Sequence, residues 1–457
     1  MKKIFSLLFA VCFVVFAVFA VTACDETTSE TPEEPIKFSY SLVKEDDATY
    51  YSLKSVTISE AAKKLVDKND YEALAELFNT SIDGVYTAPE TKYTKDTVRT
   101  VVIPAEYNKK PVKAISADAI SGLVFVKKIV VGENIDKIAE GAFSSLGSLE
   151  EIELPFVGGE YNAKNEKKLF GYIFGTTSGD DLNACDQVYN EGESGNTKTY
   201  QIPYTLKTVT VTKGNEKSTK ELTYKIDGDK YVYSTDDGYA DLEGDEHVIK
   251  KVDDSKYAVA AYSFYGCTTI ETVNLSGITE IEPYTFYGCA SITTLNCEGL
   301  TKIGDSAFET CTALKSFDFT GIEKVGKAAF KDCTALGGNY ADKANDVVIP
   351  ETLTEEIGES AFEGCSGIIT LKIKSAADIG KYAFKSLTSL KNLYFETAGT
   401  KIGYAAFYGC TAVEAIDLAN VTELGDYAFY GCKKLKTVEN LGNLYAEHAF
   451  DETEYSK

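Results

Sequence analysis

The sequence contains very little histidine. Only His247 and His448 occur in 457 residues, and a long stretch of chain separates them. Imidazole is a frequent zinc ligand and the usual base of a Ser–His–Asp triad, so most His-based metal sites and such a triad are excluded. A GxSxG elbow, a phosphate-binding glycine loop, an HExxH helix and a GxGxxG turn between a strand and a helix are missing too. We therefore expect a protein that is not an enzyme and that uses no cofactor and no metal.

Positive charge is also scarce. The chain has 46 basic and 70 acidic residues, a formal net charge of −24 and a pI near 4.6. A surface of this sign repels phosphate backbones, which argues against a nucleic-acid partner. With 44% hydrophobic and 25% charged residues, the composition is that of ordinary globular proteins. The length suits two or three domains, unless a repeat extends a single one.

The first residues have the pattern of an export signal. Lys2 and Lys3 precede an almost wholly apolar run that extends to Val21, and small residues then lead to Cys24. This arrangement resembles a bacterial lipobox. It predicts that residues 1–23 are a lipoprotein signal peptide and that Cys24 is the acylated residue.

The segment that follows predicts a tether. Residues 24–35 are acidic, contain two prolines and have almost no apolar side chains, so they are expected to be disordered. The predicted location is the extracytoplasmic cell surface, with the lipid anchor as the only contact with the membrane. Cleavage near Ala23 that leaves a soluble secreted protein, and retention of the segment as an anchor, are the alternatives.

A phenylalanine recurs through the second half of the chain, mostly at intervals of 22 residues. One interval of 32 contains an extra ten residues around 337–346. The unit reads Ile-Gly-x-x-Ala-Phe-x-Gly-Cys-x-x-Leu-x-x-Val-x-Leu, and earlier copies are centred on Phe143 and Ile120. The recurring positions are Phe264, Phe286, Phe308, Phe330, Phe362, Phe384, Phe407, Phe429 and Phe450.

The unit predicts its own folding. Its last residues alternate between apolar and polar, which indicates a short strand with one buried face. The Ala-Phe-x-Gly-Cys segment predicts a short helical or 3₁₀ turn with the phenylalanine pointing inward. One unit cannot bury its apolar side alone, so the copies must stack and share a core. The prediction is an α/β solenoid with turns of about 22 residues.

These motifs resemble the BspA-like, Treponema-type class of bacterial leucine-rich repeats over residues 97–457. The resemblance implies a curved, right-handed solenoid on a cell surface or in a secreted protein, associated with adhesion and protein–protein contact and not with catalysis. Residues 156–205 resemble an insertion that recurs between two turns in that family.

Two regions depart from the repeat. In residues 36–96, a tyrosine-rich alternating stretch precedes an N-cap at Ser59 and an amphipathic segment over residues 60–78, which predicts strands and then one helix. We interpret this region as a small N-terminal cap. In residues 213–256, alternation around Asp227-Gly228 predicts a β-hairpin that projects from the solenoid.

Seven of the eleven cysteines lie three residues after the repeat phenylalanine: Cys267, Cys289, Cys311, Cys333, Cys365, Cys410 and Cys432. Thiols stacked in this way could form disulfides outside the cytoplasm. The same position holds Leu146 and Leu387 in other units, however, which marks an apolar core site that a free thiol also suits. We favour free, buried thiols, and the lack of a CxxC pair argues against a thiolate metal cluster.

Two further groups have a functional and a simpler interpretation. Six acidic residues between 236 and 246 could supply oxygens to calcium, but their spacing does not fit an EF-hand, and a solvated charge run explains them. Tyrosine pairs around the repeat phenylalanine suit contact with a protein or a glycan, or simple packing of turn on turn. These pairs are Tyr262 and Tyr265, Tyr284 and Tyr287, and Tyr427 and Tyr430.

The residue between the last two apolar strand positions of each unit should face solvent along the concave side. Because solenoids bind partners across such surfaces, this row is the predicted binding site, and an extracellular protein is the predicted partner. A glycan-binding accessory protein and a structural coat protein are the alternatives. The row comprises Glu153, Thr210, Asn274, Asn296, Asp318, Val348, Lys372, Tyr394, Asp417 and Glu439.

Overall fold

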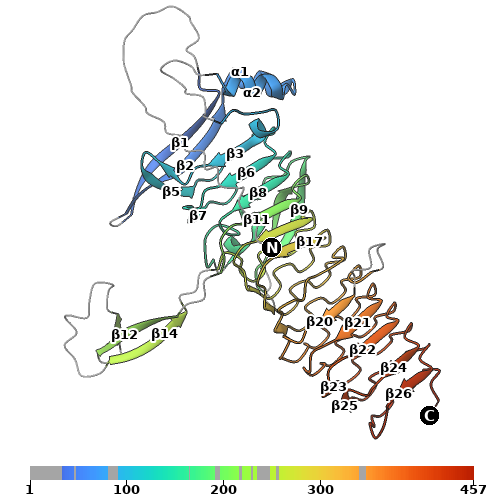
Figure 1. Ribbon diagram of the computed structural model, residues 1–457. Helices are drawn as coiled ribbons and strands as arrows, with labels where there is room; N and C mark the ends of the chain where they lie inside the picture. The colour runs from blue at the N-terminus through green and yellow to red at the C-terminus, as the bar shows by residue number, and fades with distance from the viewer. Residues whose placement is uncertain are drawn as a thin grey trace, which may run out of the picture.

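The computed structural model describes residues 33–45, 48–80, 91–163, 165–190, 196–215, 219–227, 230–233, 247–253, 257–338 and 346–456 (Figure 1). The predicted signal peptide, Cys24, most of the tether and the acidic run at 236–246 lie outside the described residues. Within the described ranges, no helix combines the length and the apolarity that a membrane crossing requires.

The described chain begins with a β-hairpin. Strand β1 (Ile36–Glu45) pairs antiparallel with β2 (Ala48–Ile58), and Leu53 and Val56 of β2 are buried in the core. Strand β2 also pairs in parallel with β5 (Lys110–Ile115). The hairpin therefore extends a sheet of the first repeat turns.

The segment predicted as one helix forms two. Ser59 caps α1 (Glu60–Asp67), and its hydroxyl accepts a hydrogen bond from an amide of the first turn at 3.2 Å. Asn69 has a φ of 55°, which ends the helical path. Asp70 then caps α2 (Tyr71–Phe78) in the same manner at 3.1 Å. The single-helix prediction was wrong because a second N-cap lies within an otherwise continuous apolar pattern.

A parallel sheet of six short strands forms one side of the repeat stack, in the order β17-β15-β11-β8-β6-β3. Alternate residues are buried, as Val209 and Val211 of β11 illustrate. This is the one-sided alternation that the sequence predicts. The strands are β3 (Thr100–Ile103), β6 (Lys128–Val131), β8 (Glu151–Leu154), β11 (Thr208–Val211), β15 (Thr272–Leu275) and β17 (Thr294–Cys297).

Beyond β17 the strands form separate groups. Strands β20, β21 and β22 pair in parallel, and so do β24 and β26. The described turn around Asp318 has no strand. This turn differs in carrying Phe317, where other units have a smaller apolar residue, and the rings of Phe317 and Phe319 both pack on Phe330. The later strands are β20 (Val347–Ile349), β21 (Thr370–Ile373), β22 (Asn392–Phe395), β24 (Ala415–Asp417) and β26 (Thr437–Glu439).

A second set of very short parallel strands ends at the isoleucine position of the Ile-Gly pair in each unit. The sequence analysis did not predict this set. Isolated bridges join Ile379 to Ile357 and to Ile402 along the same side. The strands have too few residues for alternation to be visible in the sequence. They are β7 (Lys137–Ile138), which pairs with β5, and β16 (Glu280–Ile281), β18 (Lys302–Ile303), β19 (Lys324–Val325), β23 (Thr400–Ile402) and β25 (Val421–Leu424). Strand β4 (Glu106–Tyr107) pairs antiparallel with β5.

The segment around each repeat phenylalanine is a series of tight turns and not a regular helical or 3₁₀ turn as predicted. In every turn from Phe264 to Phe450, the residues two before and two after the phenylalanine have positive φ. In the Phe286 turn these are Tyr284 (58°) and Gly288 (72°). The amides of Tyr284, Phe286 and Gly288 donate to carbonyl oxygens of the next turn at 2.8–2.9 Å. A helix would bond these amides within its own segment, so the stack replaces helical bonds with bonds between turns.

The phenylalanine rings form one stack through the core. From Phe264 to Phe429 neighbouring centroids lie 5.1–5.3 Å apart, with interplanar angles of 13° or less. Phe170, from the first insertion, lies 5.1 Å from Phe264 and 5.3 Å from Phe174, which in turn lies 6.5 Å from Phe143. The first insertion therefore links the early and late turns.

Each insertion contributes its own antiparallel strands. The first contains η2 (Glu166–Lys168), η3 (Phe170–Ile173) and the paired strands β9 (Leu182–Val188) and β10 (Thr197–Pro203). In the second, β12 (Thr219–Asp227) and β13 (Lys230–Tyr233) form the expected hairpin, and β14 (His247–Asp253) adds a strand that was not predicted. In Figure 1 this small sheet lies apart from the stack of turns.

Candidate binding surfaces

The predicted solvent-facing residues of the first sheet lie side by side. Glu153, Thr210, Asn274 and Asn296 are paired in register across β8, β11, β15 and β17. Asn274 Nδ2 donates to Thr210 Oγ1 at 3.0 Å, and Asn296 Nδ2 donates to Asn274 Oδ1 at 2.7 Å. These bonds fix the side chains before any partner arrives, which lowers the entropic cost of binding. We call the ten predicted residues, from Glu153 to Glu439, the strand row.

The beginning of this surface is apolar, which the sequence analysis missed. Val102 of β3 and Val130 of β6 continue the register of Glu153 toward the N-terminus. Val102 has 55% of its surface exposed. The signal was available, because Val102 and Val130 occupy the strand position at which most later units carry a polar residue.

Lys128 neutralises Glu153 at this end of the strand row. Its Nζ lies 2.6 Å from Glu153 Oε1 and 3.2 Å from Glu151 Oε2. Burial lowers the pKa of Lys128, but the hydrogen bonds to Glu153 and Glu151 outweigh burial and raise it overall. The lysine is therefore charged at neutral pH, and Glu153 is a paired rather than a free carboxylate.

The later members of the strand row form two smaller groups. Lys372 stands between Val348 and Tyr394 in the register of β20, β21 and β22. Its Nζ lies 2.7 Å from Asp346 Oδ2. Tyr394 is 49% exposed, so this group offers a large ring to solvent.

Two aspartates of the strand row receive backbone hydrogen bonds. Asp417, which faces Glu439 in register, accepts from Asn440 Nδ2 at 2.7 Å and from a nearby backbone amide at 2.9 Å. These bonds hold the pKa of Asp417 below its usual range. Asp318 is exposed and accepts a backbone amide at 2.9 Å, although no strand carries it. The structure therefore distributes the predicted row over three strand groups and one strandless turn.

The repeat tyrosines stack on one another from turn to turn. Tyr262 and Tyr284 have centroids 4.9 Å apart and an interplanar angle of 11°, and Tyr265 and Tyr287 are 4.7 Å apart at 8°. A second group has ring distances of 5.0–5.7 Å. Packing of turn on turn is thus observed. The second group consists of Tyr382, Tyr404, Tyr408, Tyr427 and Tyr430.

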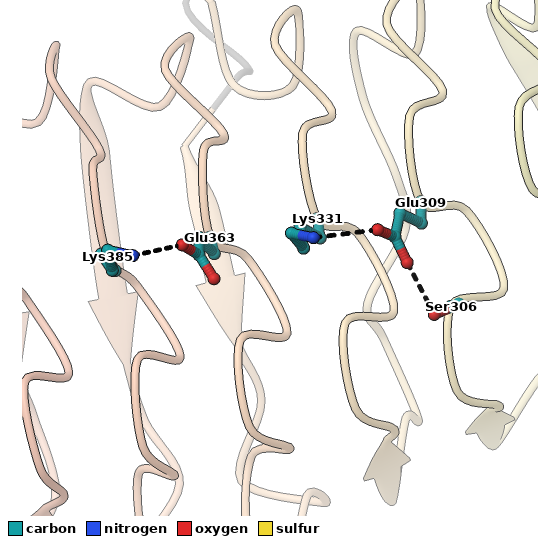
Figure 2. A network of polar contacts seen from close by, with 5 residues as sticks. All are labelled: Ser306, Glu309, Lys331, Glu363 and Lys385. Atoms are coloured by element: carbon teal, nitrogen blue, oxygen red, sulfur yellow. Dashed lines mark hydrogen bonds and ion pairs between the residues drawn. The ribbon is translucent and has the colours of Figure 1, made fainter.

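Between the two tyrosine groups, the position after the phenylalanine carries alternating charges (Figure 2). Lys331 Nζ lies 3.1 Å from Glu309 Oε1, and Lys385 Nζ lies 2.7 Å from Glu363 Oε1. Ser306 Oγ also donates to Glu309 at 2.7 Å. Burial raises the pKa of Glu363, but hydrogen bonds, above all that from Lys385, lower it overall. These charges pair across neighbouring turns and stabilise their alignment.

In the described part of the chain, the repeat cysteines are free thiols, as predicted. From Cys289 to Cys432, each Sγ donates to the carbonyl oxygen of the phenylalanine one turn earlier, at 3.0–3.3 Å. Burial raises the pKa of the Cys289 and Cys311 thiols, so they stay protonated. Cysteine therefore fills an apolar site and adds a hydrogen bond to a carbonyl that in most of these turns also accepts a backbone amide.

Metal binding receives no support from side-chain placement. Among the described residues, no group of three or more His, Cys, Asp or Glu side chains is arranged to hold an ion. The acidic run at 236–246 falls outside them.

The repeat geometry agrees with a known sequence family. The BspA type Leucine rich repeat region matches the chain in six copies, over residues 93–167, 250–338 and 339–455. The chain belongs to this family. The matches exclude much of both insertions, which have antiparallel strands of their own.

Solved structures similar to this BspA-type chain come from bacteria. A leucine-rich repeat protein from Bacteroides ovatus is 18% identical with a TM-score of 0.39, and the match covers 93% of this chain and 92% of that one. A leucine rich cell surface protein from Faecalibacterium prausnitzii is 16% identical with a TM-score of 0.32, covering 95% and 96%. A Leucine Rich Repeat protein from T. pallidum is 25% identical with a TM-score of 0.30, covering 34% and 70%. A search of curated proteins finds no match to this chain.

The BspA-type repeats begin beside a pocket that the sequence analysis missed. It has a volume of about 380 Å³, and its lining includes Tyr71 of α2, Arg99 of η1 (Thr97–Arg99), Thr100 of β3 and Lys128 of β6. The one feature of the sequence that draws attention to this place is Arg99, the only arginine in the sequence.

Proposed function

We propose that this BspA-type protein is exported, anchored by a lipid at Cys24, and binds an extracellular protein through the strand row. In this proposal the turns of about 22 residues form a curved, right-handed solenoid with the strand row on its concave side. The observation that supports it most is the hydrogen-bonded, in-register run of Thr210, Asn274 and Asn296. Family membership supports the surface location and a scaffold role without catalysis.

The form of the strand row favours a protein as the partner. Each turn offers one side chain, so a ligand must extend across several turns to gain affinity. The row mixes amides, paired charges and the exposed ring of Tyr394, which is the mixture of polar and aromatic contacts found in protein interfaces. Specific protein interfaces bury on the order of 800 Å² on each side, so a partner must also contact residues beside the ten of the row.

A glycan is the second candidate, and one observation favours it. Tyr404 and Tyr394 expose 41% and 49% of their surfaces, and flat amphipathic rings suit stacking against sugars. Saturable binding on a glycan array by the chain without its lipid anchor, abolished by Tyr404→Ala, would favour this candidate over a protein partner.

Site-directed photocrosslinking tests the strand row. A benzoylphenylalanine in place of Asn296 puts the probe on the row, and the same probe in place of the exposed Thr312 serves as the matched control on the turn side. We expect one protein to be crosslinked from position 296 and not from position 312 on cells that carry the partner. Equal crosslinking from both positions would contradict the proposal.

Lipid anchoring has a separate test. Cys24→Ser should abolish labelling by a radioactive fatty acid and release the protein from membranes, because one cysteine would carry the acyl chains. Cys12→Ser, which lies within the predicted signal peptide, is the control and should leave labelling unchanged. Unchanged membrane partition of Cys24→Ser would reject the lipid anchor without affecting the strand row.

A further inference from the structure

The pocket beside α2 contains an arginine in an unusual setting. The guanidinium of Arg99 lies over the ring of Tyr71, with 4.4 Å between its central carbon and the ring centroid. Its Nε donates to the carbonyl oxygen of Phe125 at 2.8 Å. Stacking and this bond together fix the plane of the group. Among the described residues, no side chain bonds the two terminal nitrogens of the fork, which can therefore bind a ligand.

Arg99 differs from the other cations of the pocket in having no carboxylate partner within the described part of the chain. Lys127 Nζ lies 2.5 Å from Glu150, and Lys128 pairs with two glutamates. Lys95 lies 3.9 Å from Glu72. The lysine charges are therefore largely satisfied, whereas that of Arg99 is balanced only by a ring and a carbonyl.

The unpaired positive charge in the pocket is that of Arg99. The three lysines of the lining each have a glutamate partner, and with Glu72 and Glu153, which stand outside the lining, five carboxylates surround the four cations, so an anion with more than one charge is disfavoured. The whole chain carries −24, which repels polyanions at longer range. A dianionic phosphate would bring a second negative charge close to three carboxylates. One carboxylate matches both the unpaired charge and the planar fork of Arg99.

The pocket is continuous with the strand face. Thr100 lines it and pairs in register with Lys128, which pairs with Glu151 on the next strand. An extended chain that lies across these strands would thus reach Arg99 at one end. This continuity favours a peptide over a free sugar acid as the source of the carboxylate.

We propose that the Arg99 pocket binds one carboxylate of a peptide, either its C-terminus or an acidic side chain, through the fixed guanidinium fork. The identification of the source as a peptide rests on the proposed protein-binding function. Binding of a single carboxylate by the stacked Arg99 does not require that the strand row bind a partner.

The single arginine makes a direct measurement possible. In protein labelled with ¹⁵N-arginine, one side-chain Nε signal reports Arg99 alone. The probes are an N-acetylated hexapeptide with a free C-terminus and no acidic side chain, the same peptide with Asp at its third position and a C-terminal amide, the neutral amide without Asp, glucuronate and inorganic phosphate. We expect a saturable shift of the Nε signal with the first two and none with the neutral amide. No saturable shift with either acidic peptide overturns the proposal. Tighter binding of glucuronate or phosphate overturns the assignment to a peptide.

Variants separate the fork from simple charge. By fluorescence anisotropy of the labelled free-acid peptide, Arg99→Lys should weaken binding about tenfold or more, because the paired, charge-assisted hydrogen bonds are lost. Tyr71→Phe keeps the ring and should bind normally, whereas Tyr71→Ala should weaken binding. Lys434→Ala, an exposed lysine far along the chain, is the charge control. Wild-type affinity in Arg99→Lys would contradict the role of the fork.

One variant separates binding at the Arg99 pocket from binding at the strand row. Asn296→Lys should leave the peptide titration unchanged while blocking a partner that uses the row. Thermal melts of each variant show whether a loss of binding reflects unfolding.

Discussion

Cys311 Sγ donates a hydrogen bond to the carbonyl oxygen of Phe286, one turn earlier, at 3.1 Å. Both residues are buried, and the same relationship joins Cys333 to Phe308 at 3.0 Å. The Phe286 carbonyl also accepts the backbone amide of Cys289 at 3.1 Å, so the thiol adds a second, weaker hydrogen bond to its apolar packing. The repeat phenylalanine and cysteine therefore hold adjacent turns together through their backbone as well as through apolar packing.

Cys311→Ala should lower the free energy of unfolding by about 1–2 kcal/mol, because it removes a small buried group and one of the two hydrogen bonds that the Phe286 carbonyl accepts. Cys311→Ser retains a donor and tests the hydrogen bond separately from the apolar contact. Denaturant unfolding with and without dithiothreitol gives the measurement. Strong destabilisation of the wild type by the reductant would show that the thiols are oxidised and would contradict this account.

Phe308→Ala should cost about 3–5 kcal/mol, because the ring is fully buried and stacks between Phe286 and Phe330 at 5.2 Å on each side. Each turn contacts chiefly its neighbours, so the damage should begin locally. Hydrogen exchange should accelerate in the turns of Phe286 and Phe330 before that of Phe429. Uniform acceleration over all turns would show that the stack unfolds as one unit.

Thr310 occupies the left-handed position after Phe308, with a φ of 62°, where the preceding turn has Gly288. A β-branched residue is strained in this conformation, so Thr310→Gly should raise the free energy of unfolding by about 0.5–1 kcal/mol. Gly288→Thr is the reciprocal change and should lower it by about 1–2 kcal/mol. Denaturant midpoints of the two variants decide the matter, and destabilisation by Thr310→Gly would be the contrary result.

The free energy of unfolding should depend on pH in the acid range through the ion pair of Glu363 and Lys385. The folded-state pKa of Glu363 is below its ordinary value of 4.5, so the stabilisation is present above that value and is lost as pH falls through the folded-state pKa. Lys385→Met should therefore lower stability by about 1 kcal/mol or less at neutral pH, and the difference from wild type should shrink in acid. Lys434→Met is the control and should show no such pH dependence. Urea midpoints over the acid range measure it, and a difference that grows in acid would reverse the sign.

The sequence predicts the repeat well because its apolar residues recur at fixed intervals. Phe264 to Phe450 all occupy equivalent positions, and the hairpin at Asp227 is present as its turn residues indicate. The short helical or 3₁₀ turn predicted at each phenylalanine does not form as a regular element, because every second amide bonds the next turn, mostly 21 to 23 residues away. No local propensity reports such bonds, and non-glycine residues such as Tyr284 conceal the positive φ.

Of the two candidate sites, the strand row could be predicted from the sequence and the Arg99 pocket could not. The strand row follows from alternation, and its members in β8 to β17 lie in register as expected. Asp318 lies in a turn without a strand although its neighbours alternate, so alternation alone does not decide strand pairing there. The Arg99 pocket is formed by α2 together with β3 and β6, elements that only the fold brings together.

The most direct test of the account is the affinity of the crosslinked partner for variants of the strand row. Asp417→Lys and Tyr394→Ala should weaken binding in surface plasmon resonance, with Tyr394→Ala raising the dissociation rate and Asp417→Lys mainly altering the association rate and its salt dependence. Asp318→Lys, from the strandless turn, should act like Asp417→Lys. Thermal melts of each variant control for folding. If all three bind as the wild type does while removal of residues 213–256 abolishes binding, the second insertion is the site and the central claim is wrong.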